Sequence, residues 1–158
     1  YGLTDADLPN GSVVQVVYAG SQPSATITTT STSYIDSGVT ASITPSSSSN
    51  KVYIMTAINI YLGIGAANAW HRCNFALKRG ATTIYETSDS ASAGYSFSLY
   101  TTDSVDRTMM KTTFPYLDSP ATTSSVTYDI YFNSPNAYTT IINPTYGKSE
   151  ITLMEIKA

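Results

Sequence analysis

The chain has 158 residues, of which 42% are hydrophobic and 12% charged, and its formal net charge is -3. A chain of this length forms one domain around one ordinary hydrophobic core. The acidic balance and the scattered Lys and Arg exclude a basic surface for a phosphate backbone, so we expect no nucleic-acid partner. No apolar run approaches the ~20 residues that span a bilayer, so we expect no membrane insertion.

The N-terminal segment, residues 1–11, is predicted to be a linker or N-terminal arm that ends in the Asn10-Gly11 turn pair. The domain proper is expected to cover residues 12–158. Its first strand, residues 12–18, is apolar on both faces, which is typical of a strand that is covered on both sides. Burial of the second face against another copy would also protect an exposed edge. We therefore predict a homo-oligomer, specifically a trimer, with an interface formed by Val13, Val14, Val16 and Val17.

The next segments alternate between extended chain and turns. Residues 25–33 are rich in Thr and predict a strand, and residues 34–43 predict an extended chain interrupted by a turn or bulge at Gly38, where Asp36 can bond local amides. After the serine loop 46–49, the clearest strand covers residues 51–62. Val52 to Leu62 alternate regularly between the two faces, so this strand is expected to anchor the core.

The second half of the chain continues the same pattern. Residues 71–78 and 82–87 flank the Arg79-Gly80-Ala81 turn and predict a β-hairpin. Further strands are predicted at residues 95–100, 108–117, 124–133, 138–143 and 148–157. Short strands separated by Gly, Pro, Asn and Ser indicate an all-β fold: an antiparallel β-sandwich, with the jelly roll as the favoured form.

The residues that usually carry chemistry are scarce. His71 is the sole histidine and Cys73 the sole cysteine, so we expect no catalytic residues, no metal site and no cofactor. Gly147-Lys148-Ser149 resembles the end of a phosphate loop but lacks the preceding glycine, and is predicted to be a hairpin turn. Three loop carboxylates leave a polysaccharide hydrolase or a calcium site as remote alternatives. They are Asp89, Asp103 and Asp106.

Aromatic residues are the better candidates for binding, because an aromatic ring with a polar tip suits both saccharide faces and protein interfaces. Four of them lie next to predicted turns or loops. We predict them as ligand-contacting residues: Trp70, Tyr95, Tyr138 and Tyr146.

Four segments, in this order, resemble structural domains of tailed bacteriophages of the marine and cyanobacterial type, which recur in tail fibres, head fibres and other virion proteins. They are residues 8–16, 32–46, 116–123 and 151–156. The resemblance extends over nearly the whole chain and carries no catalytic motif. It implies a virion surface module that is commonly trimeric in fibres.

Two functions follow from this resemblance. In the first, the chain is the distal domain of a tail fibre and recognises a host-surface glycan. In the second, it is a head fibre or decoration protein bound to the capsid, and its role is assembly or attachment among other virion proteins. Both place the protein in the virion after assembly in the host cytoplasm.

Overall fold

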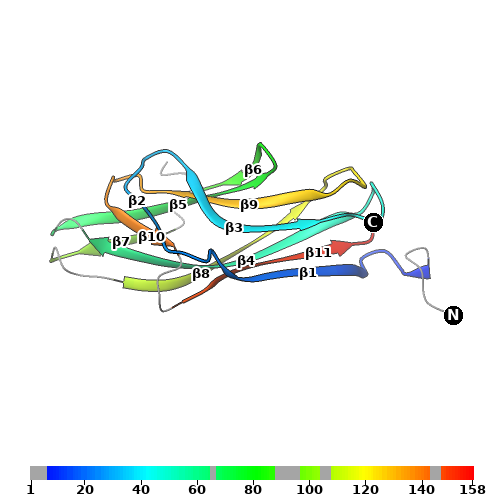
Figure 1. The fold of residues 1–158 in the computed structure, drawn as a ribbon, viewed down its shortest axis with the longest axis horizontal. Helices are drawn as coiled ribbons and strands as arrows, with labels where there is room; N and C mark the ends of the chain where they lie inside the picture. Colours follow the sequence, from blue (N-terminus) through cyan, green and yellow to red (C-terminus); the bar gives the residue numbers. More distant parts are fainter. Residues whose placement is uncertain (1–6, 65–66, 88–96, 104–107, 143–146) are drawn as a thin grey trace.

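A computed structural model describes five stretches of the chain: residues 7–64, 67–87, 97–103, 108–142 and 147–158. Eleven strands form within them, arranged in two layers (Figure 1). The first sheet contains β1 (Val13–Gln22), β2 (Ile27–Thr29), β4 (Lys51–Ile64), β8 (Thr108–Asp118), β10 (Thr139–Ile142) and β11 (Ser149–Ile156). The second contains β3 (Ile35–Ile43), β5 (Ala69–Arg79), β6 (Thr82–Glu86), β7 (Phe97–Thr101) and β9 (Val126–Asn133).

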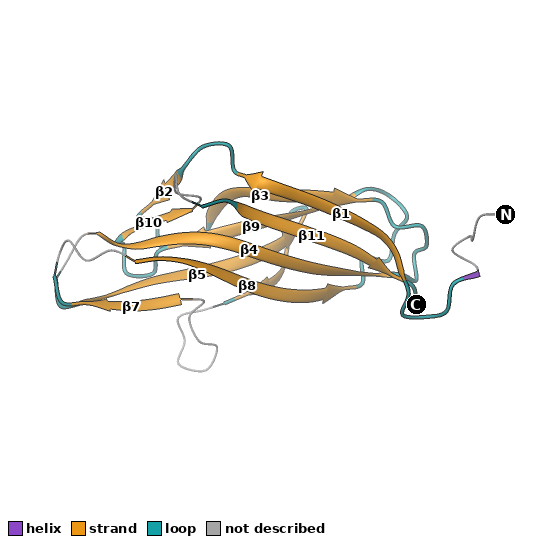
Figure 2. Ribbon diagram, turned by 90° about the horizontal axis from the view of Figure 1, so that it is seen from below, coloured by secondary structure: helices purple, strands orange, loops and turns teal. Residues whose placement is uncertain are grey.

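The two sheets have the strand order of a jelly roll. In the first sheet β1, β11, β4 and β8 lie side by side, and in the second the order is β3, β9, β5, β6. All strand pairs are antiparallel, and each sheet takes strands from both halves of the chain (Figure 2). The predicted antiparallel β-sandwich of jelly-roll form is therefore confirmed.

The core lies between the sheets and is built from the inward positions of each strand. On β4, the predicted inward side chains are fully or almost fully buried, and this strand is the centre of the first sheet. The opposite layer contributes residues such as Phe75, Ile130 and Phe132, each with no exposed surface. Along one open side, Tyr85 of β6 stacks on Phe114 and Tyr116 of β8, with ring centroids 5.9 and 5.7 Å apart, so aromatic rings close the gap between the layers.

The bulge predicted at Gly38 is present. The register of β3 against β9 shifts between Asp36 and Val39, Gly38 has a φ of 69°, and its amide donates to Asp36 Oδ1 over 2.7 Å. A side chain at Gly38 would also meet Pro23, because an added Cβ would lie 2.8 Å from the Pro23 Cβ. Glycine is thus required at this position both by the backbone conformation and by the close approach of Pro23.

Two expectations about local structure need correction. The strand predicted over residues 25–33 is reduced to the three residues of β2, since its Thr-rich sequence does not fix which face is buried. The turn predicted at residues 147–149 is not a hairpin. Both β10 and β11 pair antiparallel with β4, and β8 pairs with the other edge of β4. The strands β10 and β11 therefore lie end to end along the same edge of β4 and do not pair with each other. At the junction, Asn59 of β4 donates from Nδ2 to the Lys148 carbonyl over 2.7 Å.

Candidate functional site

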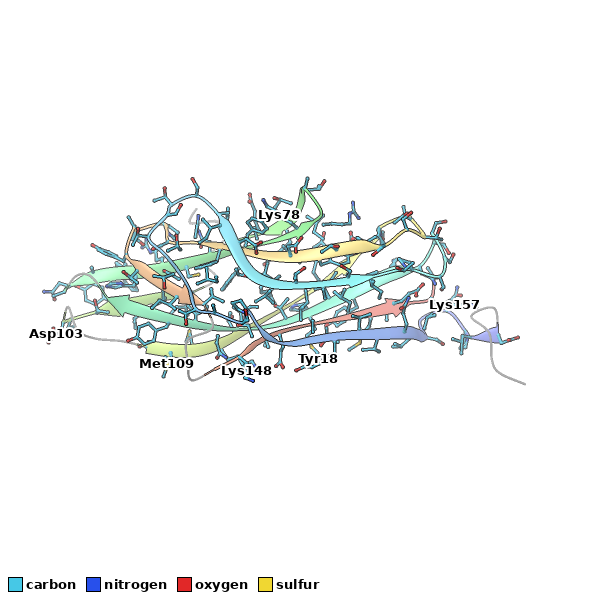
Figure 3. The ribbon with its side chains drawn as sticks, viewed as in Figure 1. Tyr18, Lys78, Asp103, Met109, Lys148 and Lys157 are labelled. Atoms are coloured by element: carbon cyan, nitrogen blue, oxygen red, sulfur yellow. The ribbon has the colours of Figure 1, made fainter. Side chains whose placement is uncertain are left out.

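The outer surface of the first sheet is the main candidate site, because it is apolar where a sandwich surface is ordinarily polar. Among the described residues, nine large hydrophobic or aromatic side chains are exposed, and six of them lie on this surface. We call these six the apolar face: Val13, Val16, Tyr18, Met55, Met109 and Leu117. In Figure 3 the first sheet is the lower layer. Tyr18 and Met109 lie on its outer side, below the sandwich, whereas Lys78 lies above the upper layer.

The strand register aligns the apolar face into continuous rows. One row crosses β1, β11, β4 and β8 and consists of Val16, Met154, Tyr53 and Leu117. The next row consists of Tyr18, Thr152, Met55 and Pro115. Adjacent members of a row face the same side of the sheet, so these two rows form a contiguous apolar surface rather than a set of isolated side chains. Met109, paired with Tyr61, lies beyond Lys111 and is separated from the rows.

A polar strip borders these rows. Lys111 of β8 forms an ion pair with Glu150 of β11 over 2.6 Å, and the Tyr18 hydroxyl donates to Glu150 over 2.8 Å. The hydrogen bond from Lys111, followed in size of effect by the one from Tyr18, lowers the pKa of Glu150 below its ordinary value. The hydrogen bond to Glu150 is in turn the main cause of the raised pKa of Tyr18. Each carboxylate oxygen of Glu150 thus has a donor at neutral pH.

A shallow hollow of about 250 Å³ lies between the rows and the strip. The small side chains of Ala57 and Thr113, which are cross-strand neighbours on β4 and β8, line its floor. Tyr18, Met55 and Glu150 form its walls. A hollow with a small-residue floor and partly apolar walls fits an inserted side chain.

The outer surface of the second sheet is different in character. Its outward cross-strand neighbours include Thr40 with Asp129, Asp129 with Lys78, and Lys78 with Thr83. Lys78 also lies 3.8 Å from the ring centroid of Tyr131. Around Lys78 this surface has the polar pattern of a solvated sheet, and its exposed large side chains are the neighbouring pair Trp70 and Tyr100. The apolar rows across four strands belong to the first sheet.

The four valines predicted at an interface divide between two environments. Val13 and Val16 are exposed and belong to the apolar face, with 49% and 56% of their surface accessible. Val17 is partly buried against the core, and Val14 lies at a bulge between the paired residues Val13 and Gln15. The sequence missed the contribution of β4 and β8, although the signal was present in the apolar side chains on both faces of these strands.

Trp70, predicted as a ligand contact, is exposed and has an aromatic neighbour. It pairs across the strands with Tyr100 of β7, and the two rings meet edge to face with centroids 5.1 Å apart. The Arg72 guanidinium lies 5.8 Å from the Trp70 ring centroid. The sequence did not single out Tyr100 or Arg72, because their closeness to Trp70 depends on strand pairing.

The other predicted aromatic contacts have different surroundings. Tyr138 is half-buried, and its ring lies 4.5 Å from that of His71, which has no exposed surface. Tyr138 is therefore part of the packing at this end of the sandwich. Tyr95 and Tyr146 lie outside the described residues.

The residues considered for chemistry are dispersed. Cys73 is fully buried in the core cluster, and burial raises the pKa of its thiol far above the ordinary value. Asp103 is exposed, whereas Asp89 and Asp106 lie outside the described residues. Within the part of the chain that the structure describes, no group of three or more His, Cys, Asp or Glu could hold a metal ion, and no helix is long and apolar enough to cross a membrane.

Comparisons with known proteins give little similarity. No protein-family model matches the chain, and no curated protein does. Among solved structures, the D431N mutant VP2 protein of infectious bursal disease virus, in derived T=1 particles, aligns over 94% of this chain at 9% identity and a TM-score of 0.29. The structure of infectious bursal disease virus Gt strain aligns over 94% at 9% identity and a TM-score of 0.31. The chain spans about a third of those proteins, 34% and 37%.

Proposed function

We propose that this domain is a structural module of a virus particle that assembles with copies of itself through the apolar face. The observation that carries the proposal is the contiguous apolar surface across β1, β11, β4 and β8, opposite a polar surface on the other sheet. Surfaces of this kind mark protein interfaces in soluble proteins. The order of assembly is expected to be three, in keeping with the fibre domains that the sequence resembles.

The size of the surface agrees with such a role. Four strands spaced about 4.8 Å apart, each presenting about seven residues of about 3.3 Å, have a projected area of about 440 Å². A standard interface removes about 800 Å² of accessible surface from each partner. Because side chains enlarge the accessible area well beyond the projection, the apolar face and its rim are of the right order for a specific contact.

More specifically, we propose that the chain is the distal domain of a tail fibre and recognises a host-surface glycan. The exposed Trp70–Tyr100 pair supports this form. The alternative is a capsid-bound head fibre or decoration protein with an assembly or attachment role. Labelling of intact virions with an antibody against the domain separates the two, since label at the tail tip supports the fibre and label on the capsid supports decoration.

The assembly is tested by sedimentation velocity and light scattering of the purified domain at micromolar concentration. We expect a trimer for the unaltered chain. We expect the double variant Val16→Lys/Met55→Lys to be monomeric, because two ammonium groups would then lie in the rows that contact a neighbour. Circular dichroism and a thermal melt establish that this variant is folded.

The control is Thr83→Lys, which adds one ammonium group at an exposed position on the outer side of the second sheet. It is expected to leave the oligomer unchanged. A stable monomer of the unaltered domain at micromolar concentration would contradict the proposed assembly, as would an oligomer that Val16→Lys/Met55→Lys leaves intact.

A further inference from the structure

The aromatic pair on β5 and β7 has the geometry of a saccharide site. Trp70 and Tyr100 are 48% and 45% exposed, and their ring planes meet at 63°. We propose that this corner binds one pyranose ring of a surface polysaccharide, with the sugar packed on the Trp70 face and bordered by Tyr100. The inference names the ligand site of the proposed fibre function and rests on that function for its biological role.

The chemistry of the two rings suits a sugar. The C–H bonds on one face of a pyranose pack on the electron-rich face of an aromatic ring, and the tyrosine hydroxyl adds a hydrogen-bonding group at the edge. Both residues belong to paired strands, with Trp70 directly opposite Tyr100 in the register. Strand pairing therefore fixes the corner before a ligand arrives, which reduces the entropy lost on binding.

Arg72 adds selectivity for charge. It lies two residues beyond Trp70 on the same side of β5, and His71 between them faces the core. Its guanidinium presents several donors in a plane that matches a carboxylate. We infer that a uronic-acid residue binds more tightly than a neutral hexose at this corner.

The position of the corner permits binding in the assembled particle. Trp70 lies on the outer side of the second sheet, whereas the apolar face belongs to the first. Asp103, which follows β7 by two residues, lies at the end of the sandwich opposite to Lys157 (Figure 3). A copy held through the apolar face therefore leaves the corner accessible.

The test uses the fact that Trp70 is the sole tryptophan of the chain. Titration of the folded domain with polygalacturonate is expected to give a saturable change in tryptophan emission, and dextran a weaker one. We expect Tyr100→Ala to weaken binding about tenfold, the effect of losing one well-packed aromatic contact. Arg72→Met is expected to remove the preference for polygalacturonate over dextran. Tyr131→Ala, an aromatic deletion elsewhere on the same sheet, should leave binding unchanged.

A glycan array that includes lipopolysaccharide and capsular oligosaccharides, probed in parallel with the unaltered domain and with Trp70→Ala, identifies the source of the sugar. Binding that disappears in Trp70→Ala supports the site. Binding that Trp70→Ala and Tyr100→Ala retain would overturn it, as would the absence of any saccharide binding by a domain that sedimentation shows to be a trimer. A monomer that still binds sugar through Trp70 would instead contradict the assembly and leave the site standing.

Discussion

Arg79 and Asp118 join the two sheets at one end of the sandwich. Arg79 Nη1 of β5 lies 3.0 and 2.9 Å from the two carboxylate oxygens of Asp118, which ends β8 in the other layer. Tyr128, the cross-strand neighbour of Arg79, donates its hydroxyl to the same carboxylate over 2.7 Å. Burial, and then the bond to this carboxylate, raise the pKa of Tyr128. Asp118 is buried, and these two side chains donate the hydrogen bonds that its carboxylate oxygens accept.

Removal of either donor is expected to destabilise the fold. Arg79→Met should lower the free energy of unfolding by about 1–3 kcal/mol, below the cost of breaking a fully buried pair because Arg79 is partly exposed. Tyr128→Phe should cost about 1–2 kcal/mol, since a charged acceptor loses one hydrogen bond. Urea denaturation measures both.

The matched control for this pair is Lys78→Met, which deletes the neighbouring cation on the polar outer surface. It is expected to change the free energy of unfolding by less than about 1 kcal/mol. An equal loss in Lys78→Met and Arg79→Met would show that the Arg79–Asp118 contact is not the source of the effect.

Gly38→Ala tests the bulge in β3. The variant combines a left-handed backbone with an added carbon against Pro23, so we expect a loss of about 2–3 kcal/mol in the free energy of unfolding. Gly80→Ala is the matched control, because Gly80 also has a positive φ but no atom lies within 4 Å of the added carbon. It should cost only about 1 kcal/mol. If thermal melts show that Gly38→Ala and Gly80→Ala lose equal stability, the Pro23 contact does not contribute to the cost of Gly38→Ala.

Local patterns predicted much of this fold, whereas non-local relationships required the structure. The alternation in β4 and the conformational freedom of Gly38 are properties of a few consecutive residues, and both predictions were confirmed. The closeness of Trp70 to Tyr100 depends on the pairing of β5 with β7, which single residues do not encode. The end-to-end placement of β10 and β11 likewise arises because both pair with β4.

The candidate site was anticipated only in part for the same reason. The apolar valines of β1 stand out in the sequence because four of them occur within five residues. The rest of the apolar face comes from single side chains, such as Met55 and Leu117, that become neighbours only when β4 and β8 are aligned. An apolar residue at an outward position resembles a core residue until the register is known.

Cys73 provides a reporter of unfolding. The thiol is buried in the core and its pKa is raised by burial, so both access and the thiolate population are low in the folded state. Iodoacetamide labelling at pH 8 should proceed at the rate set by opening of the fold and should accelerate in step with urea unfolding. Cys73→Ala removes the labelling and serves as the control. Rapid labelling of the native protein would contradict the buried placement of the thiol.

Glu155 is expected to set the acid limit of stability. Its side chain is buried and accepts bonds from Gln15 Nε2 over 2.6 Å, from Asn50 Nδ2 over 2.7 Å, and from the Ser46 amide and hydroxyl over 2.7 and 2.8 Å. Burial alone would raise the pKa of Glu155, but the bonds from Asn50, Gln15 and Ser46 outweigh it and lower the pKa below 4.5.

The sign of the pH dependence follows from this lowered pKa. The charged form is favoured by folding, so its stabilisation is complete above the pKa of the unfolded chain and is lost as the pH falls through the lower pKa of the folded state. Glu155→Gln should be less stable than the unaltered chain by about 1–3 kcal/mol at pH 7, because its amide is uncharged and its NH2 group replaces one of the two accepting oxygens with a donor. That difference should shrink as the pH falls below the pKa of the unfolded chain, about 4.3, and through the lower pKa of Glu155 in the folded state.

Melts between pH 3 and pH 7 measure this difference, with Glu86→Gln on the exposed strand β6 as the matched control. The control is expected to follow the unaltered chain at every pH. A Glu155→Gln deficit that stays constant from pH 7 to pH 3 would mean that the residue acts through its shape alone. A deficit that becomes smaller in acid would instead show that the charge of the carboxylate stabilises the contact with Gln15 and the Ser46–Asn50 loop, because protonation removes the negative charge and turns one accepting oxygen into a donor.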